Sequence, residues 1–278
     1  EIGSAPQALV AAGAGPVHDG RIDLTNSALR LCERDLIAAT GAGYARVIND
    51  FTAAAWSVAN VSASDVLSLQ GSGTPPEGTR LVAGPGTGLG VGALLCSDGA
   101  YHTVSGEGGH IGLSPRNRDE VEIFEAARQL VPHCFFGDSL TLEAEMFLSG
   151  TGLPILYQAI ALTAGQTTLQ ARNAQVILQD AKNGADPIAT RTAQVFASHL
   201  GAVLGDLAVT LMATGGVYLV GGVAEKNPWL FDRQFQQAFT NGGRFTELRH
   251  SLSLYVSKQQ EFGLVGAQNY LRNALEQG

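Results

Sequence analysis

A glycine-rich stretch at residues 81–95, LVAGPGTGLGVGALL, constrains the fold of this chain most strongly. Apolar runs of strand length, Leu81–Ala83 and Val91–Leu95, flank the loop Gly84–Gly90, which predicts two buried strands joined by a tight turn. The turn holds more glycine than a hairpin needs, and Thr87 adds a hydroxyl donor. Backbone N–H groups without side-chain cover can approach an anion, so the stretch fits a phosphate cradle or an ordinary hairpin. It has neither the Walker nor the Rossmann spacing.

The composition is that of an acidic chain with a large core. Of the 278 residues, 45% are hydrophobic and 15% are charged, which allows one big domain or two ordinary ones and argues against disorder. The net charge is −8 and no basic run occurs, which argues against nucleic acid and anionic membranes as partners. No apolar run approaches the length that spans a membrane. Scattered cysteines indicate neither a disulfide framework nor a zinc knuckle, and we expect a cytoplasmic protein.

Strand-like and helix-like patterns alternate along the chain, which favours an α/β fold. Strands are expected at Ala8–Ala14, Arg21–Leu24, Arg46–Ile48, Tyr101–Val104, Val217–Val220 and Leu252–Val256, besides the glycine hairpin. Helices are expected at Ala28–Leu36 (started by Thr25-Asn26-Ser27), Phe51–Val58, from Arg118, at Leu140–Leu148, from Thr151 to Leu162, and at Ile188–Met212, Asp232–Thr240 and Gly263–Leu275. Residues 62–79 are expected to form a loop. The string Gly-Thr-Gly-Leu occurs at Gly86–Leu89 and at Gly150–Leu153, which we interpret as shared turn chemistry and not as a repeat.

Polar residues at the ends of predicted strands are candidates for chemistry. Asn49 and Asp50 join a strand to an alanine-rich helix, so either can cap that helix. Asp50 can also be a carboxylate at the sheet edge where α/β proteins bind ligands, and the two interpretations are compatible because the helix dipole keeps a capping carboxylate ionised. In Ser105–His110, SGEGGH, glycines expose Glu107 and His110 together, which favours a ligand site over a structural turn.

Two further candidates are weaker when taken alone. Glu145 lies in a predicted helix, where an acid usually faces solvent. Gly221 and Gly222 follow the apolar strand Val217–Val220, and they fit a strand-end turn or a backbone platform for a nucleotide base or ribose.

Taken together, the stretches RVINDFTAAAW, LVAGPGTGLGVGALL, SGEGGHIGLSP, EAEMFLSGTGLPILY and YLVGGV resemble the bacterial glucokinase family, within the actin-like ATPase and hexokinase superfamily. The resemblance runs from about Leu9 to the C-terminus and is weakest at residues 158–188. It implies an α/β fold of two ribonuclease-H-like domains that close on a cleft. We expect a small domain from residues 1–60 and 260–278, incomplete at its N-terminus, and a large domain from residues 61–259.

The resemblance also implies the reaction and the residues that perform it. ATP, with Mg²⁺, would phosphorylate the 6-hydroxyl of glucose, and Asp50 would be the catalytic base. The sugar hydroxyls would be held by Asn49, Asp50, Glu107, His110 and Glu145. The phosphates would face Gly86, Thr87 and Gly88, and the adenosine would lie beside Gly221 and Gly222. It suggests a homodimer, and it assigns no metal ligand in this sequence.

One departure from the family keeps a second function open. The family's N-terminal strand and phosphate-gripping turn match nothing before Leu9, so we expect this segment to lie outside the sequence. A chain without it fits a non-catalytic sugar sensor, which keeps the sugar residues but not the phosphate grip. A DNA-binding regulator is a weaker third alternative, because no helix-turn-helix module or basic patch is visible.

Overall fold

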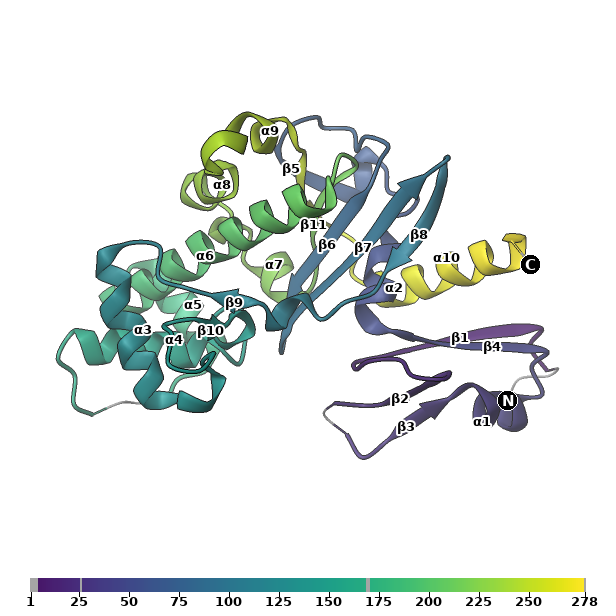
Figure 1. The fold of residues 1–278 in the computed structure, drawn as a ribbon, viewed down its shortest axis with the longest axis horizontal. Helices are drawn as coiled ribbons and strands as arrows, with labels where there is room; N and C mark the ends of the chain where they lie inside the picture. Colours follow the sequence, from purple (N-terminus) through teal and green to yellow (C-terminus); the bar gives the residue numbers. More distant parts are fainter. Residues whose placement is uncertain (1–4, 26, 169–170, 278) are drawn as a thin grey trace.

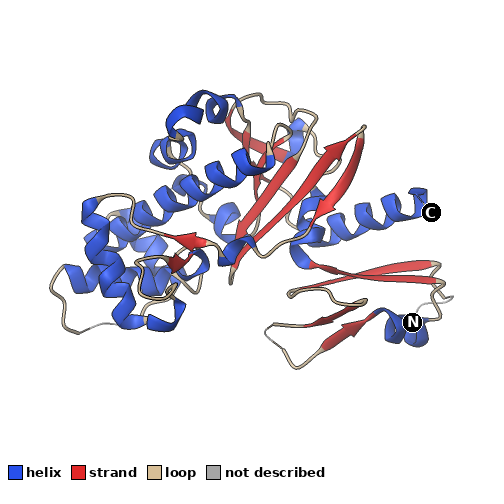
Figure 2. Cartoon of the chain, in the orientation of Figure 1, coloured by secondary structure: helices blue, strands red, loops and turns tan. Residues whose placement is uncertain are grey.

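A mixed six-stranded sheet organises the larger part of the molecule, as the computed structural model shows for residues 5–25, 27–168 and 171–277 (Figures 1 and 2). Its strands follow the order β5-β12-β11-β6-β7-β8. The bounds are β5 Val66–Gln70, β6 Arg80–Pro85, β7 Leu89–Ser97, β8 Ala100–Val104, β11 Gly216–Leu219 and β12 Leu254–Ser257. Strand β11 is parallel to β6 and β12, and the glycine hairpin β6–β7 is antiparallel as predicted.

Apolar side chains alternate between the two faces of this sheet. On β11, Val217 and Leu219 join one buried cluster, whereas Tyr218 and Val220 join the other. Such alternation is what a strand with both faces covered requires. The first cluster packs against most of the helices, and the second packs against α2 (Asp50–Ser57) and α10 (Phe262–Gln277).

The helices that pack with the first cluster come from residues 118–251, and α3, α4 and α5 lie beside α6, away from the sheet (Figure 1). Their bounds are α3 Arg118–Leu130, α4 Leu153–Thr163, α5 Ala174–Asn183, α6 Pro187–Leu211, α7 Gly222–Lys226, α8 Arg233–Thr240 and α9 Thr246–Ser251. Short 3₁₀ turns lie at η1 Ala63–Asp65, η2 Gly108–His110, η3 Pro132–Cys134, η4 Ala144–Met146, η5 Pro228–Leu230 and η6 Gly243–Phe245. Helix α6 is long and apolar enough to cross a membrane, but 56% of its apolar window is buried, as in a core helix of a folded domain.

The N-terminal elements form two small sheets beside the large one (Figure 1). Strands β1 (Ala8–Gly13) and β4 (Tyr44–Asn49) form a parallel pair. Strands β2 (Arg21–Asp23) and β3 (Arg30–Cys32) form an antiparallel pair, and α1 spans Glu33–Thr40. The strand predicted at Arg21–Leu24 is present as β2, which pairs with β3. The helix predicted at Ala28–Leu36 begins instead at Glu33, since residues 30–32 are used in that pairing. Asn26, part of the predicted helix start, lies outside the described residues.

Two other predicted segments differ from the structure. Residues 62–79 contain η1 and the edge strand β5, although they read as a loop. Residues 140–148, predicted as a helix, form the short strand β10 (Leu142–Glu143) followed by η4. Strand β10 pairs with β9 (Gly112–Leu113), so a long-range strand pairing overrides the local helical pattern.

Helix α2 is held firmly at both ends. Asn49 caps its N-terminus, where its side-chain oxygen accepts from the N–H groups of Phe51 (2.8 Å) and Thr52 (3.2 Å). At the other end the buried Arg80 guanidinium donates to the carbonyls of Val58 and Ala59, which favours the negative end of the helix dipole. This helix carries Asp50, so its anchoring fixes the position of that carboxylate.

Candidate active site

The turn of the glycine hairpin, residues 86–88, presents unused donors to solvent. Gly86 N–H donates to the Gly88 carbonyl (2.8 Å), which closes the turn. Within the described residues, the N–H groups of Thr87 and Gly88 and the Thr87 hydroxyl have no hydrogen-bond partner, and Thr87 is exposed. Unpaired N–H groups and a hydroxyl on a tight turn are donors that an anion could use.

Asp50 is the first residue of α2, and the next side chain, Phe51, packs on the glycine hairpin. A Cβ at Gly90 would lie 1.8 Å from the Phe51 ring, and one at the facing Gly84 would lie 2.9 Å from it. These glycines therefore make room for the ring, which sets the first turn of α2 against β6 and β7. Burial raises the pKa of Asp50, while hydrogen bonds from the N–H groups of Phe51 and Asp50 itself oppose that rise.

Asn49 is used within the fold, as the capping interpretation predicts. Besides its cap, its side-chain N–H donates to the carbonyl of Gly15 (3.0 Å), which ties the loop after β1 to the start of α2. Its predicted contact with a sugar hydroxyl stays a prediction.

Three acids surround His110. Glu107, on the same 3₁₀ turn, has an oxygen 4.0 Å from His110 Nε2, and Glu143 of β10 makes a hydrogen bond with His110 Nδ1. These carboxylates raise the pKa of His110, chiefly through the Glu143 hydrogen bond, with smaller effects of the Glu143, Glu145 and Glu107 charges; partial burial opposes them. Imidazole and carboxylate groups that remain half-exposed, as His110 and Glu107 do, can exchange hydrogen bonds with a polyol.

Glu145 joins this acidic cluster to the glycine turn. Its Oε2 accepts a hydrogen bond from Leu89 N–H (2.7 Å), the first residue after the turn. A Cβ at Gly88 would lie 2.3 Å from the same oxygen, so glycine is needed there for the approach of Glu145. The structure therefore brings together Glu107, His110 and Glu145 with residues 86–89.

Gly221 and Gly222 lie at the same edge of the sheet as the turn. Val220 N–H donates to the Ala83 carbonyl (2.9 Å), and a Cβ at Gly221 would lie 3.9 Å from the Pro85 carbonyl. Gly221 has a φ of +87°, which favours glycine, whereas a Cβ at Gly222 would meet no atom within 4 Å. The backbone after β11 is thus open beside the turn.

Glu143 is a residue that the sequence interpretation missed. In the helix predicted at residues 140–148, Glu143 and Glu145 are two residues apart, so their side chains would point to different sides. Its contact with His110 follows from the pairing of β10 with β9, which places Glu143 opposite Gly112. The only signal in the sequence was the alternating Glu-Ala-Glu at residues 143–145.

We expect Glu143→Gln to lower the pKa of His110, because it removes the main cause of the raised value. A histidine whose pKa is raised on folding contributes stability that is complete below about pH 6.5 and is lost as pH rises through the folded pKa. The free energy of unfolding of the variant should therefore be lower than that of wild type mainly between about pH 5 and 6.5. The difference should be small, because solvent screens the half-exposed pair.

An NMR titration of the His110 ring checks this expectation. The matched control is Glu122→Gln, which changes an exposed acid on α3 and should leave the titration in place. A His110 pKa that is equal in wild type and Glu143→Gln would contradict the assigned hydrogen bond.

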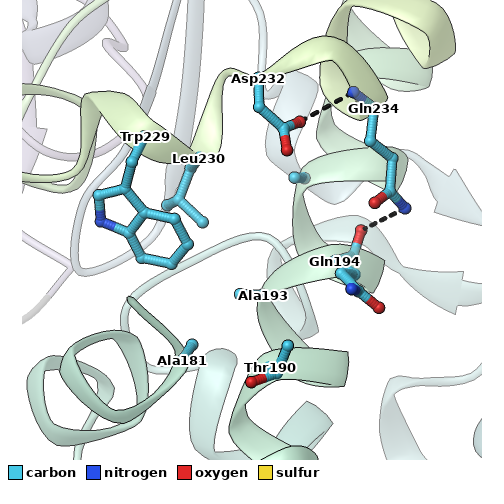
Figure 3. A pocket seen from close by; sticks show the side chains of 9 residues that line it. Ala181, Thr190, Ala193, Gln194, Trp229, Leu230, Asp232 and Gln234 are labelled. Atoms are coloured by element: carbon cyan, nitrogen blue, oxygen red, sulfur yellow. Dashed lines mark hydrogen bonds between the residues drawn. The ribbon is translucent and has the colours of Figure 1, made fainter. Parts of the chain in front are cut away.

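Two surface cavities lie away from these residues. One, of about 150 Å³, lies between α5, α6 and the segment around η5, with Trp229 at its rim and Ala193 and Thr190 of α6 along its wall (Figure 3). The other, of about 350 Å³, contains Arg172, which pairs with Asp180 (2.7 Å) and Asp186 (3.2 Å). Among the described residues that line this second cavity, the only cation is thus already paired. We therefore keep the turn at residues 86–88 and its neighbours as the candidate site.

Comparison with known proteins agrees with the motifs and the fold. The family model described as Glucokinase matches residues 2–274. A glucokinase of Rhizobium etli is 36% identical over 269 residues, which are 96% of this chain and 76% of the relative. A glucokinase of Rhizobium meliloti is 32% identical over 274 residues, which are 98% of this chain and 78% of that relative.

Solved structures show the same fold. The glucokinase from an Antarctic psychrotroph superposes with a TM-score of 0.82 at 26% identity, covering 95% of this chain and 80% of that one. A ROK family glucokinase from Streptomyces griseus, in complex with glucose and AMPPNP, gives a TM-score of 0.62 at 21% identity, with 95% and 80% covered. The predicted α/β class is confirmed, and the chain belongs to the glucokinase family of sugar-phosphorylating enzymes.

Proposed function

We propose that this protein transfers the γ-phosphoryl group of ATP to the 6-hydroxyl of glucose. The observation that carries the proposal is the Glu145–Leu89 hydrogen bond, which joins the acid–imidazole cluster to a turn with free N–H and hydroxyl donors. A polyol and a polyphosphate bound on either side of this contact would be neighbours. The relative from Streptomyces griseus, described with glucose and AMPPNP, supports the choice of ligands.

In the proposed reaction, Asp50 takes the proton of the 6-hydroxyl as the hydroxyl oxygen forms its bond to the γ-phosphorus. The bond between that phosphorus and the β–γ bridging oxygen breaks, ADP leaves, and Asp50 later releases the proton to water. Glu107, His110, Glu145 and Asn49 hold neighbouring sugar hydroxyls. Residues 86–88 hold the phosphates, and Gly221 and Gly222 support the adenosine.

Magnesium enters this proposal with the nucleotide. The described residues contain no group of three or more His, Cys, Asp or Glu side chains that could hold a metal ion by themselves. Mg²⁺ keeps several waters and binds through substrate phosphates with few protein carboxylates, so this donor set fits a nucleotide-borne ion. When bound, the ion neutralises phosphate charge.

We propose that residues 1–60 and 260–278 move against residues 61–259 to exclude water around the substrates. We also propose that the protein is cytoplasmic and dimeric.

A coupled assay for glucose 6-phosphate tests the proposed function on the chain as it is, with ATP and Mg²⁺. Turnover that depends on both glucose and ATP is the expected result, and the Asp119→Asn variant, which changes an exposed acid in the first turn of α3, should retain it. Glucose binding by calorimetry without any turnover would contradict the kinase and favour the sugar sensor.

A further inference from the structure

The second Gly-Thr-Gly-Leu string lies directly against the first. Gly150 N–H donates to the Gly86 carbonyl (2.7 Å), and the Thr151 hydroxyl donates to the Thr87 carbonyl (2.8 Å). With the Glu145–Leu89 bond, the segment 145–151 reaches both sides of the turn. The two strings have different local structures, since one closes a hairpin and the other precedes α4, so they act as partners and not as copies.

Segment 145–151 is itself rigidly held. The Ser149 side chain is fully buried, and its hydroxyl donates to the Glu145 carbonyl (2.8 Å) and accepts from Gly152 N–H (2.9 Å). Leu148 and Leu153 on either side are fully buried in the main core. The segment is therefore anchored in the core, and its hydrogen bonds fix the position of the turn.

These contacts decide which groups the turn can offer to a ligand. They occupy the carbonyls of Gly86 and Thr87, so the acceptors of the turn are engaged by protein. The N–H groups of Thr87 and Gly88 stay without partners among the described residues. A turn whose carbonyls accept hydrogen bonds from the protein and whose N–H groups are free favours the binding of an anion.

We propose that segment 145–151 couples sugar binding to the phosphate turn, with Thr151 as a positioning residue that acts through Thr87. The proposal rests on the function proposed above. Glu145 has two oxygens: Oε2 is engaged with Leu89, which leaves Oε1 to accept from a sugar hydroxyl. A sugar that restricts the motion of this carboxylate also restricts the motion of the turn. Each substrate therefore strengthens the binding of the other by the same factor, about 5- to 150-fold in typical cases.

Two substitutions at Thr151 separate positioning from general structure. Thr151→Val keeps the shape but removes the donor to the Thr87 carbonyl, whereas Thr151→Ser keeps the donor. The matched control is Thr163→Val, which removes a comparable hydroxyl bond, to the Ile160 carbonyl (2.8 Å), at the far end of α4.

The readouts are hydrogen exchange of a peptide that spans residues 86–89 and the Kd of AMPPNP with and without glucose. In wild type, glucose should slow exchange in this peptide and tighten AMPPNP binding. In Thr151→Val, exchange there should be faster and the effect of glucose on AMPPNP should fall at least several-fold, while the Kd of glucose alone stays unchanged. Thr151→Ser and Thr163→Val should behave as wild type.

The outcomes distinguish the two proposals. A Thr151→Val protein that binds both ligands with wild-type coupling and wild-type exchange at residues 86–89 would overturn the coupling proposal alone. A Thr151→Val protein that weakens glucose as much as AMPPNP would show a merely structural role and overturn it too. Wild-type protein that binds neither ligand would overturn the proposed function and the coupling with it.

Discussion

Asp50→Asn is expected to reduce kcat by about 10²- to 10⁴-fold, the usual contribution of a general base. The Kd of glucose should change little, because asparagine keeps the size of the side chain and can still accept a hydrogen bond. Pre-steady-state or coupled kinetics give kcat, and calorimetry gives the Kd. In wild type, activity should fall as pH drops through an Asp50 pKa that lies above the ordinary 3.8, because the base must be ionised.

The same variant should not be less stable than wild type at neutral pH. Burial raises the pKa of Asp50, so the folded state binds this proton more readily than the unfolded state does. The carboxylate therefore lowers the stability of the wild type as pH rises through this pKa, and the neutral amide avoids that cost. Thermal melts at pH 7 and near pH 3 should show the advantage of the variant disappear at the lower pH.

The control for Asp50 is Asp119→Asn, which should keep both kcat and the melting temperature. If Asp50→Asn turned over normally, the assignment of the base would be wrong. If it lost activity only together with its fold, the melts would show this directly.

Gly266→Ala is expected to destabilise the protein by about 3 kcal/mol or more, at the upper end of the cost of overpacking. Helix α10 lies so close to α2 that a Cβ at Gly266 would stand 1.6 Å from the Ala53 carbonyl oxygen. That atom belongs to the backbone of α2 and cannot turn aside. For a chain of this length the loss corresponds to about 5 °C or more in Tm, which calorimetry or circular dichroism would measure.

Gly263→Ala provides the matched control in the same helix. A Cβ there would meet no atom within 4 Å, so the better helix propensity of alanine should leave stability equal or slightly higher, by up to about 1 kcal/mol. Equal melting of the two variants would contradict the close packing of α10 on α2.

Much of the candidate site could be predicted because it depends on local sequence. The glycine hairpin combines β-branched runs with a glycine turn, and the alanine-rich α2 follows a residue, Asn49, that caps helices well. Both signals are short-range, and both elements were found where the sequence placed them.

The errors arose where distant segments decide the structure. Residues 140–148 have apolar residues at helical spacing, yet the pairing of β10 with β9 extends residues 142–143. That pairing created the contact of Glu143 with His110, which no local pattern contains. Gly88 has a further role that no local pattern contains, because it makes room for the Glu145 carboxylate.

The packing of α10 on α2 has a consequence for biosynthesis. Asn269 donates to the Trp56 carbonyl (3.0 Å) and the Trp56 and Tyr270 rings meet edge to face, so one side of α2 is completed by residues 262–277. During translation these residues are still inside the ribosome when the rest of this sequence has emerged. We therefore expect nascent chains to expose the flank of the Asp50 helix to chaperones until residues 262–277 have also emerged.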